Sequence, residues 1–262
     1  MAVARIPALA VLAALAAGAT LADDHVVVDV AIVLAIDVSG SMDVDELAIQ
    51  RAGYLDAIRH PDLHRIVAAG PNGRIALSLF EWAGNVRRES TLPWRLIDSP
   101  AAAQSFSDEV EALPFGTSFG TSISRAIDYG VELVAAAGFA ADRWVIDVSG
   151  DGPNNMGPPV TEARDRALRA GVTINGLPIV LRPARGAADL PAYFENCVTG
   201  GPDAFVMTAE SSEELALAIR RKLFRELVGQ RPAAAPEQLR RVAGAPYDCL
   251  IGERLRRERN QF

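Results

Sequence analysis

One stretch constrains the fold of this chain more than any other: residues 26–42, with the sequence VVVDVAIVLAIDVSGSM. It begins with a run rich in Val, Ile and Leu, which shows no polar–apolar alternation and is broken only by Asp29. Such a run is typical of a strand buried on both faces, as in a parallel sheet covered by helices. The run ends in Asp37-Val38-Ser39-Gly40-Ser41, where Gly40 permits a tight turn. We therefore predict a central strand followed by a polar loop.

A helix is expected directly after this loop. Asp43 and Glu46 have the spacing of a capping box, and apolar residues recur on one helical face behind them. Asp37, Ser39 and Ser41 are therefore expected between a strand and a helix, at the carboxyl end of the central strand. Ligands of open α/β sheets bind at that edge.

The rest of the chain alternates between predicted strands and helices. Strands are expected at 74–82, 87–97, 144–149, 172–180 and near 204–207, and helices at 100–113, 123–134, 159–170 and 211–228. Pro93 assigns the 87–97 strand to a sheet edge or a hairpin arm, because proline cannot donate to a strand ladder. The alternation predicts an α/β fold with a doubly wound, mostly parallel sheet and helices on both faces.

Residues 1–22 have the features of a secretory signal peptide. Arg5 precedes an Ala/Leu/Val run, and Thr20-Leu21-Ala22 offers a small-residue cleavage site. A membrane anchor needs roughly 20 apolar residues, whereas Pro7 and Gly18 interrupt this segment. We expect a periplasmic or secreted protein with no transmembrane segment after signal cleavage.

The expected domain organisation has three parts: the signal peptide at 1–22, one domain at 23–229, and a linker with a C-terminal tail at 230–262. The 262 residues, half of them hydrophobic, suffice for one large α/β domain. From Gln230 the chain is rich in Pro and Ala and then charged, which predicts a linker and a short helix. Cys197 and Cys249 are an even pair in an exported chain, so we predict a disulfide that attaches the tail to the domain.

The charge of the chain excludes some classes of partner. The net charge is −7, and no basic run is present. Nucleic-acid or anionic-lipid binding would require a basic patch. Neither is expected.

Three polar loops are expected to meet at the carboxyl edge of the sheet. The first carries Asp37, Ser39 and Ser41, the second carries Thr117 between two glycines, and the third carries Asp151 in a Gly-Asp-Gly turn. Their side chains offer carboxylate and hydroxyl oxygens, without nitrogen or sulfur. That set suits a hard divalent cation, most simply Mg²⁺, with Mn²⁺ or Ca²⁺ as alternatives.

These segments resemble the metal-ion-dependent adhesion site (MIDAS) of von Willebrand factor type A (VWA) domains. Those domains carry Asp-x-Ser-x-Ser, then Thr, then Asp, and here Asp37, Ser39, Ser41, Thr117 and Asp151 fill all the positions. The resemblance covers most of residues 26–228 and implies a Rossmann-like fold. It also implies direct coordination by both serines and the threonine, with the two aspartates acting largely through water. The family usually has Thr before the last Asp, where this chain has glycine.

The chain as a whole also resembles an exported bacterial family of unknown function that is built on this domain. The segment IDVSGDGPNN and the signal peptide carry this second resemblance.

Other polar residues are given structural roles. Asp147 lies inside a predicted strand, so we expect a structural or metal-supporting role. Asp43, Asn154, Asn155 and Glu81 are candidates for the rim of the site, but for each a solvated or capping role is preferred. His60 and His64, with Pro61 between them, are expected on a solvated loop and lack a third metal ligand.

Three functions are compatible with the sequence. The preferred hypothesis is an exported, non-enzymatic module whose divalent cation coordinates an Asp or Glu of a protein partner. A metal-dependent hydrolase, such as a phosphoesterase, is the first alternative. However, Ser39 stands where a haloacid-dehalogenase-type phosphatase needs a second Asp, and no histidine neighbours a nucleophile-bearing loop in sequence. The second alternative is a structural envelope protein with an unused site.

Overall fold

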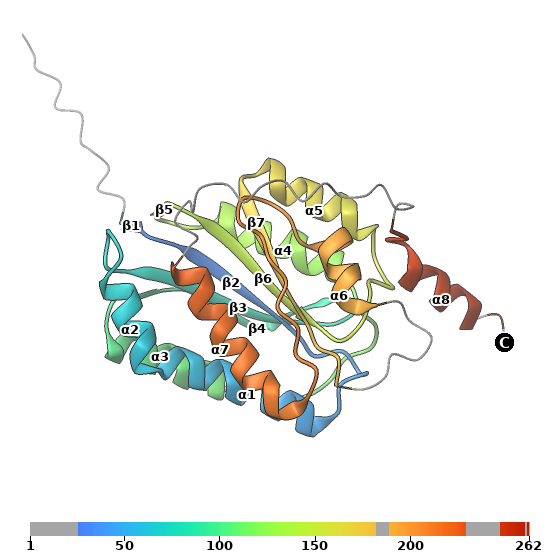
Figure 1. Cartoon of the computed structure of the whole chain (residues 1–262), viewed down its shortest axis with the longest axis horizontal. Coiled ribbons are helices and arrows are strands. Elements are labelled where there is room, and N and C mark those ends of the chain that lie inside the picture. Colours follow the sequence, from blue (N-terminus) through green and yellow to red (C-terminus); the bar gives the residue numbers. More distant parts are fainter. Residues whose placement is uncertain (1–25, 182–188, 229–246, 260, 262) are drawn as a thin grey trace, which may run out of the picture.

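The computed structural model describes residues 26–181, 189–228, 247–259 and 261, and its centre is a five-stranded sheet (Figure 1). The strands are β1 (Val27–Val28), β2 (Ala31–Asp37), β3 (Ile75–Trp82), β4 (Val86–Ile97), β5 (Ala140–Ala141), β6 (Trp144–Gly150) and β7 (Val172–Pro178). The sheet order is β4-β3-β2-β6-β7, and β1 pairs separately with β5.

The sheet is parallel except for its edge strand β4, which runs antiparallel to β3. Every residue of the central strand β2 is buried, as the uninterrupted apolar run predicts. β4 contains Pro93 and exposes charged side chains, features that protect a sheet edge from pairing with other chains. The predicted doubly wound, mostly parallel sheet is confirmed.

Helices cover both faces of the sheet (Figure 1). They are α1 (Val44–Arg59), α2 (Pro61–Ala68), α3 (Pro100–Glu111), α4 (Ile123–Ala135), α5 (Val160–Arg169), α6 (Leu190–Tyr193), the π-helical turn η1 (Phe194–Val198), α7 (Ser212–Val228) and α8 (Ile251–Arg259). α1, α2, α3 and α7 pack on one face, and α4, α5, α6 and η1 pack on the other. The alternation of β2 explains the two layers, because Leu34 faces the first core and Val33 the second.

The sequence analysis locates most elements within two residues of their ends in the structure, but it is wrong at two places. α2 begins directly after α1, because Pro61 occupies the first helical turn, where its missing N–H is not needed. His64 therefore lies in a helix and not on a loop, while His60 caps that helix and accepts a hydrogen bond from Asp62 N.

The expected strand near 204–207 is reduced to an isolated bridge between Val206 and Gly176 of β7, and a second bridge joins Ala209 to Ile179 just after β7. Gly176 of β7 donates its N–H to Phe205 O, and its carbonyl accepts from Met207 N. Pro178 has no N–H to donate, so this pairing lacks one hydrogen bond there, although Pro178 O still accepts from Ala209 N at 3.1 Å.

An ionic cluster is buried between the sheet and α7. Lys222 forms ion pairs with Asp147 of β6 and, at 2.8 Å, with Glu226. Asn175 Nδ2 of β7 also donates to Glu226 Oε1 at 3.1 Å. Asp147 thus has the structural role expected for a carboxylate inside a strand.

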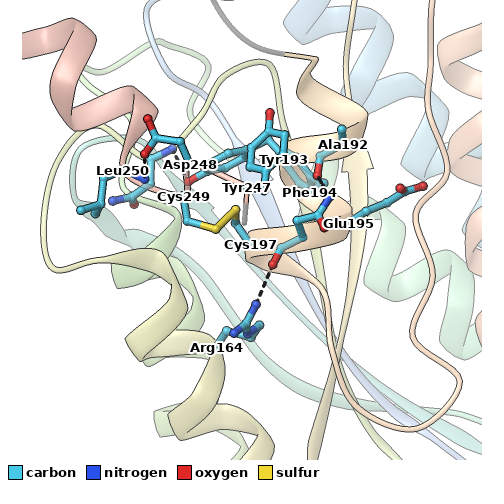
Figure 2. The surroundings of a disulfide bond; sticks show 12 residues. Arg164, Ala192, Tyr193, Phe194, Glu195, Cys197, Tyr247, Asp248, Cys249 and Leu250 are labelled. Carbon is cyan, nitrogen blue, oxygen red and sulfur yellow. Dashed lines mark hydrogen bonds between the residues drawn. A yellow bond between two sulfur atoms is a disulfide. The ribbon is translucent and has the colours of Figure 1, made fainter. Parts of the chain in front are cut away.

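The C-terminal helix α8 is attached to the domain by a disulfide. Cys197 of η1 is bonded to Cys249, two residues before α8, as Figure 2 shows. The predicted disulfide is confirmed, and the expected tail helix is present. The predicted signal peptide and residues 230–246 of the predicted linker lie outside the described residues. None of the helices that the structure describes is long and apolar enough to cross a membrane.

Candidate metal centre

The loop after β2 is folded tightly by its own polar groups. Asp37 is fully buried at the end of β2, and its Oδ1 accepts a hydrogen bond of 2.7 Å from Ser39 N. Gln50 of α1 donates to the Asp37 backbone carbonyl at 2.9 Å. Asp43 and Glu46 form the predicted capping box and start α1 immediately after the loop. The short polar sequence therefore turns the chain directly from strand to helix.

Ser39, Ser41 and Asp151 bring three oxygen atoms together. The two serine hydroxyls are 3.0 Å apart. Asp151, which follows β6, accepts hydrogen bonds through Oδ1 from Ser41 Oγ at 2.8 Å and from Ser39 Oγ at 3.3 Å. Two chain segments more than a hundred residues apart in sequence thus meet at one point, because β2 and β6 are neighbours in the sheet.

Thr117 lies in a loop that is attached to the first loop by backbone hydrogen bonds. Ser118 N donates to Val38 O at 2.9 Å, and Gly40 N donates to Ser118 O at 2.8 Å. Ser39 and Ser118 consequently form an isolated parallel bridge. The Thr117 side chain is exposed beside this bridge.

The three loops 38–42, 114–120 and 151–157 thus lie together at the carboxyl end of β2 and β6, and we call this surface the crest. Loop 151–157 is also attached to the start of α4. Asn155 Oδ1 accepts from Thr121 N at 3.1 Å, and Asn154 Oδ1 accepts from Ser124 N at 3.0 Å. The structure therefore brings together the segments that carry all five predicted site residues.

The two aspartates of the crest repel each other. Burial and then the charge of Asp151 raise the pKa of the Asp37 carboxyl well above its usual range, whereas hydrogen bonds from Ser39 lower it. Asp151 N lies 3.4 Å from Asp37 Oδ2 and donates to it. A cation between these side chains would offset the repulsion.

The geometry fits a small divalent cation. Oxygen ligands of octahedral Mg²⁺, at ~2.1 Å from the ion, lie about 3.0 Å from their neighbours. The distances of 2.8, 3.0 and 3.3 Å among Ser39 Oγ, Ser41 Oγ and Asp151 Oδ1 are close to that spacing. The structure shows no cluster of three or more His, Cys, Asp or Glu ligands within its described ranges, so a cation at the crest would depend on hydroxyl oxygens.

Two features of the structure were not predicted from the sequence. Phe119, two residues after Thr117, is 79% exposed, and the guanidinium of Arg256 from α8 lies 5.4 Å from its ring centre. An aromatic residue inside a Gly/Ser/Thr-rich loop is the only sequence signal for such an exposed ring. Glu81, expected to be solvated or to cap a helix, is instead buried and forms ion pairs with Arg51 and Arg87.

The sheet order, the two helical layers and the crest together define a von Willebrand factor type A fold. The chain belongs to the family described as "Protein of unknown function (DUF1194)", whose family model matches residues 27–231. No curated protein sequence matches the chain.

Solved structures share this fold at low sequence identity. Proximal thread matrix protein 1 from the mussel byssus is 15% identical, with a TM-score of 0.59 over 78% of this chain and 49% of that chain. A von Willebrand factor type A protein from Catenulispora acidiphila is 16% identical, with a TM-score of 0.53 over 76% of this chain and 43% of that chain. The pilus adhesin SpaC from Lactobacillus rhamnosus GG is 14% identical, with a TM-score of 0.54 over 77% of this chain and 30% of that chain.

Another structure of the mussel protein is described with a zinc-occupied MIDAS motif. It is 14% identical to this chain, with a TM-score of 0.54 over 78% of this chain and 49% of that chain. The chain thus spans less than half the length of each of these solved chains.

Proposed function

We propose that this chain is an exported module that binds a protein partner through a divalent cation held at the crest. The residues that would hold the cation are Asp37, Ser39, Ser41, Thr117 and Asp151. The proposal depends chiefly on one observation, the triangle of oxygen atoms from Ser39, Ser41 and Asp151. Two hydroxyls at this spacing match neighbouring oxygen ligands of a hard cation, and the carboxylate beside them can act through a coordinated water.

Mg²⁺ is the simplest choice of cation, with Mn²⁺ or Ca²⁺ as alternatives, because all the available ligands are oxygens. The zinc-occupied site of the mussel protein supports a divalent cation at the corresponding motif of this fold. When bound, the cation supplies a Lewis-acidic site for a carboxylate ligand.

The proposed ligand is an Asp or Glu side chain of the partner. The two negative charges of Asp37 and Asp151 together just balance the charge of a divalent cation. Ser39, Ser41 and Thr117 contribute only neutral oxygens. Ser41 and Thr117 are exposed, so the coordination positions on the solvent side are accessible to a partner. An acidic side chain would add a full negative charge at short range. The relatives named as a matrix protein and a pilus adhesin support a role in protein interaction.

A metal-dependent hydrolase, such as a phosphoesterase, is the alternative that shares the same cation site. It would need a general base near the cation, most often a histidine but also an Asp or Glu. The described histidines, His60 and His64, lie at the start of α2 and within it, and this helix is far from the crest (Figure 1). We propose a non-enzymatic role. Phosphoesterase activity that depends on Mg²⁺ would favour the alternative.

We further propose that residues 1–22 direct export to the periplasm or the outside of the cell. In this proposal 23–229 form the binding domain and 230–262 form a linker and tail. Mass spectrometry of the protein from its native envelope tests the cleavage, because the expected new N-terminus is Asp23.

The binding function is tested by capture of partners from envelope extract with and without EDTA. Thr117→Ala removes one proposed ligand, and Ser118→Ala removes the neighbouring exposed hydroxyl as a matched control. We expect capture to require the divalent cation and Thr117 but not the Ser118 hydroxyl. Undiminished capture in EDTA, with an unchanged circular dichroism spectrum, would show that this mechanism is wrong.

A further inference from the structure

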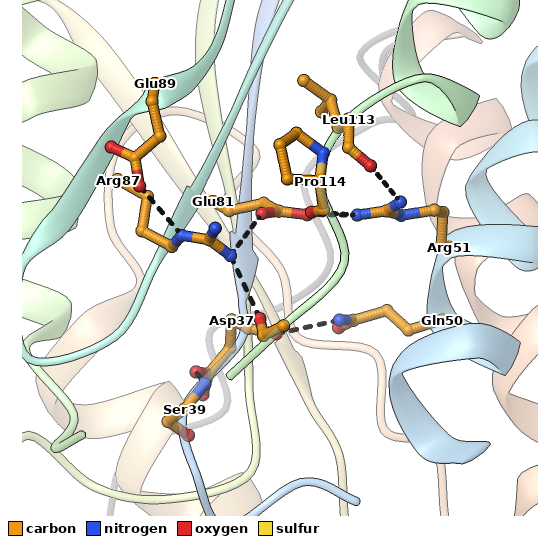
Figure 3. A network of polar contacts seen from close by, with 10 residues as sticks. Asp37, Ser39, Gln50, Arg51, Glu81, Arg87, Glu89, Leu113 and Pro114 are labelled. Carbon is orange, nitrogen blue, oxygen red and sulfur yellow. Dashed lines mark hydrogen bonds and ion pairs between the residues drawn. The ribbon is translucent and has the colours of Figure 1, made fainter. Parts of the chain in front are cut away.

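A buried glutamate joins two arginines beneath the loop that carries Thr117 (Figure 3). Glu81 of β3 is 3% exposed. Its Oε1 accepts from Arg51 Nη2 of α1 at 2.7 Å, and its Oε2 accepts from Arg87 Nη1 of β4 at 3.1 Å. We call Arg51, Glu81 and Arg87 the clamp. It connects a helix and two strands beneath residues 113–116, which lead into Thr117.

Both arginines of the clamp also bind backbone carbonyls of that loop. Arg51 donates to Leu113 O at 2.8 Å and to Pro114 O at 3.2 Å. Arg87 donates to Gly116 O at 3.0 Å. The chain forms neither helix nor strand between Leu113 and Gly116, so the guanidinium groups stabilise carbonyls that no ladder or helix pairs.

The carboxylate of Glu81 binds both guanidinium groups, and Glu89 Oε1 accepts a further hydrogen bond of 3.2 Å from Arg87 Nε. Glu81 and Arg87 are register partners across β3 and β4, so their side chains share one face of the sheet. Arg51 also lies over the ring of Phe115, 4.6 Å from the ring centre. A guanidinium presents several donors in a rigid fork, and Arg51 therefore binds the glutamate and the loop at the same time.

The loop is fixed on the far side of Thr117 as well. Ser118 exchanges two backbone hydrogen bonds with the loop after β2, to Val38 O and from Gly40 N. Thr117 thus stands between the clamp and the Ser39–Ser118 bridge. Its side chain is exposed, so the position of its hydroxyl depends on these backbone attachments rather than on packing.

We infer that Glu81, Arg51 and Arg87 are positioning residues for the cation site, which hold the backbone that carries Thr117 in place without touching the cation. This inference rests on the proposed function, because it assigns a role to residues beneath the same site. Residues that orient metal ligands from behind are worth roughly 10- to 100-fold in metal affinity.

Arg51→Lys tests the inference by calorimetric titration of the full chain with MgCl₂. Lysine keeps the positive charge beside Glu81 but lacks the fork that reaches the Leu113 and Pro114 carbonyls. We expect the Mg²⁺ affinity to fall about tenfold. The matched control is Arg59→Lys on the same helix, since Arg59 pairs with Asp108 and Glu111 of α3 and contacts no crest loop. Its expected affinity is that of the wild type.

A double-mutant cycle separates positioning from general stabilisation. If the clamp acts through Thr117, Arg51→Lys lowers the affinity in the wild-type background and has no further effect in Thr117→Ala. Equal effects in both backgrounds would contradict the inference. Melting temperatures in EDTA give the purely structural effect of each substitution. Arg87→Lys provides a second route to the same cycle if Arg51→Lys does not fold.

The inference and the proposed function fail in different ways. Absence of Mg²⁺, Mn²⁺ and Ca²⁺ binding to the wild type at millimolar concentrations overturns both. Wild-type binding together with unchanged affinity in Arg51→Lys and Arg87→Lys overturns only the positioning role.

Discussion

The side-chain amide of Asn154 donates a hydrogen bond of 2.7 Å to the carboxylate of Glu253, which joins the loop after β6 to α8. The same loop carries Asp151. Arg256 of α8 adds a second contact, a hydrogen bond of 3.3 Å to Asn155 O. The C-terminal helix therefore packs against one of the three loops of the crest, although it lies almost a hundred residues further along the chain.

Gly252→Ala is expected to displace α8. A Cβ at this position would overlap the backbone carbonyl of Asn154, and a backbone group cannot move aside as a side chain can. Forcing a methyl group into such a contact costs roughly 1–3 kcal/mol. We expect faster amide hydrogen exchange in α8 and in residues 152–156. Gly138→Ala is the matched control, because an added Cβ there meets nothing within 4 Å. Unchanged exchange in Gly252→Ala would contradict the observed packing.

Reduction of the disulfide is expected to destabilise the protein. The bond closes a loop with a sequence separation of 52 residues, which corresponds to about 4 kcal/mol in the chain-entropy model. Urea unfolding of the wild type should shift to a lower midpoint when dithiothreitol is added. Cys249→Ser should already unfold at that lower midpoint and should not respond to the reductant. Coincident curves for the oxidised and reduced wild type would show that the bond does not stabilise the fold.

Divalent cations are expected to raise the melting temperature. A ligand that binds only the folded state stabilises it by mass action, by about 2.7 kcal/mol at a concentration one hundred times its dissociation constant. Asp151→Ala and Ser39→Ala should each reduce this gain, because each removes an oxygen of the triangle. Differential scanning calorimetry with MgCl₂ and with EDTA measures the effect. An equal rise in melting temperature in the wild type and in both variants would show that the cation binds elsewhere.

The buried cluster around Lys222 predicts a loss of stability as the pH rises. Burial, and then the charge of Asp147, raises the pKa of Glu226 from 4.5 to about 7, although Lys222 opposes this shift. The folded protein therefore holds this proton more tightly than the unfolded chain does. The resulting stability is complete below pH ~4.5 and is lost as the pH rises through about 7.

Glu226→Gln isolates this contribution. The amide keeps the shape of the side chain and an oxygen acceptor for Lys222 but does not titrate. We expect the difference in free energy of unfolding between wild type and variant to change by on the order of 3 kcal/mol between pH 4 and pH 8. Urea unfolding at each pH measures it. Parallel pH profiles for the two proteins would contradict the shifted pKa.

The sequence predicts those parts of the fold in which a local pattern has one physical solution. An uninterrupted apolar run such as Ala31–Asp37 can be buried on both faces only inside a covered sheet, so the central strand follows directly. The loops that carry Asp37 and Asp151 follow parallel strands. Because parallel strands end at a common edge of the sheet, the sequence also predicts that these two loops lie together. The position of Thr117 could not be predicted in this way, because it depends on backbone hydrogen bonds between Ser118 and a loop that is distant in sequence.

The roles of isolated charged residues could not be predicted. Glu81 stands in the apolar run IALSLFEW, and nothing near it in sequence predicts burial between Arg51 and Arg87. Its partners lie 30 and 6 residues away and meet it only when α1 and β4 pack against β3. Lys222 illustrates the same limit, since its spacing to Glu226 predicts a helical ion pair but not the burial of both groups beside Asp147.

The bond between Cys197 and Cys249 makes a covalent ring of residues 197–249, and this ring contains the whole of α7. A protease that cuts the ring once opens it without releasing either piece. The fragment that begins at the cut and ends with α8 stays joined to the domain through sulfur, so the helix keeps its place beside the crest. After one cleavage between α7 and α8 the two pieces remain covalently linked, and only cleavage followed by reduction would separate them.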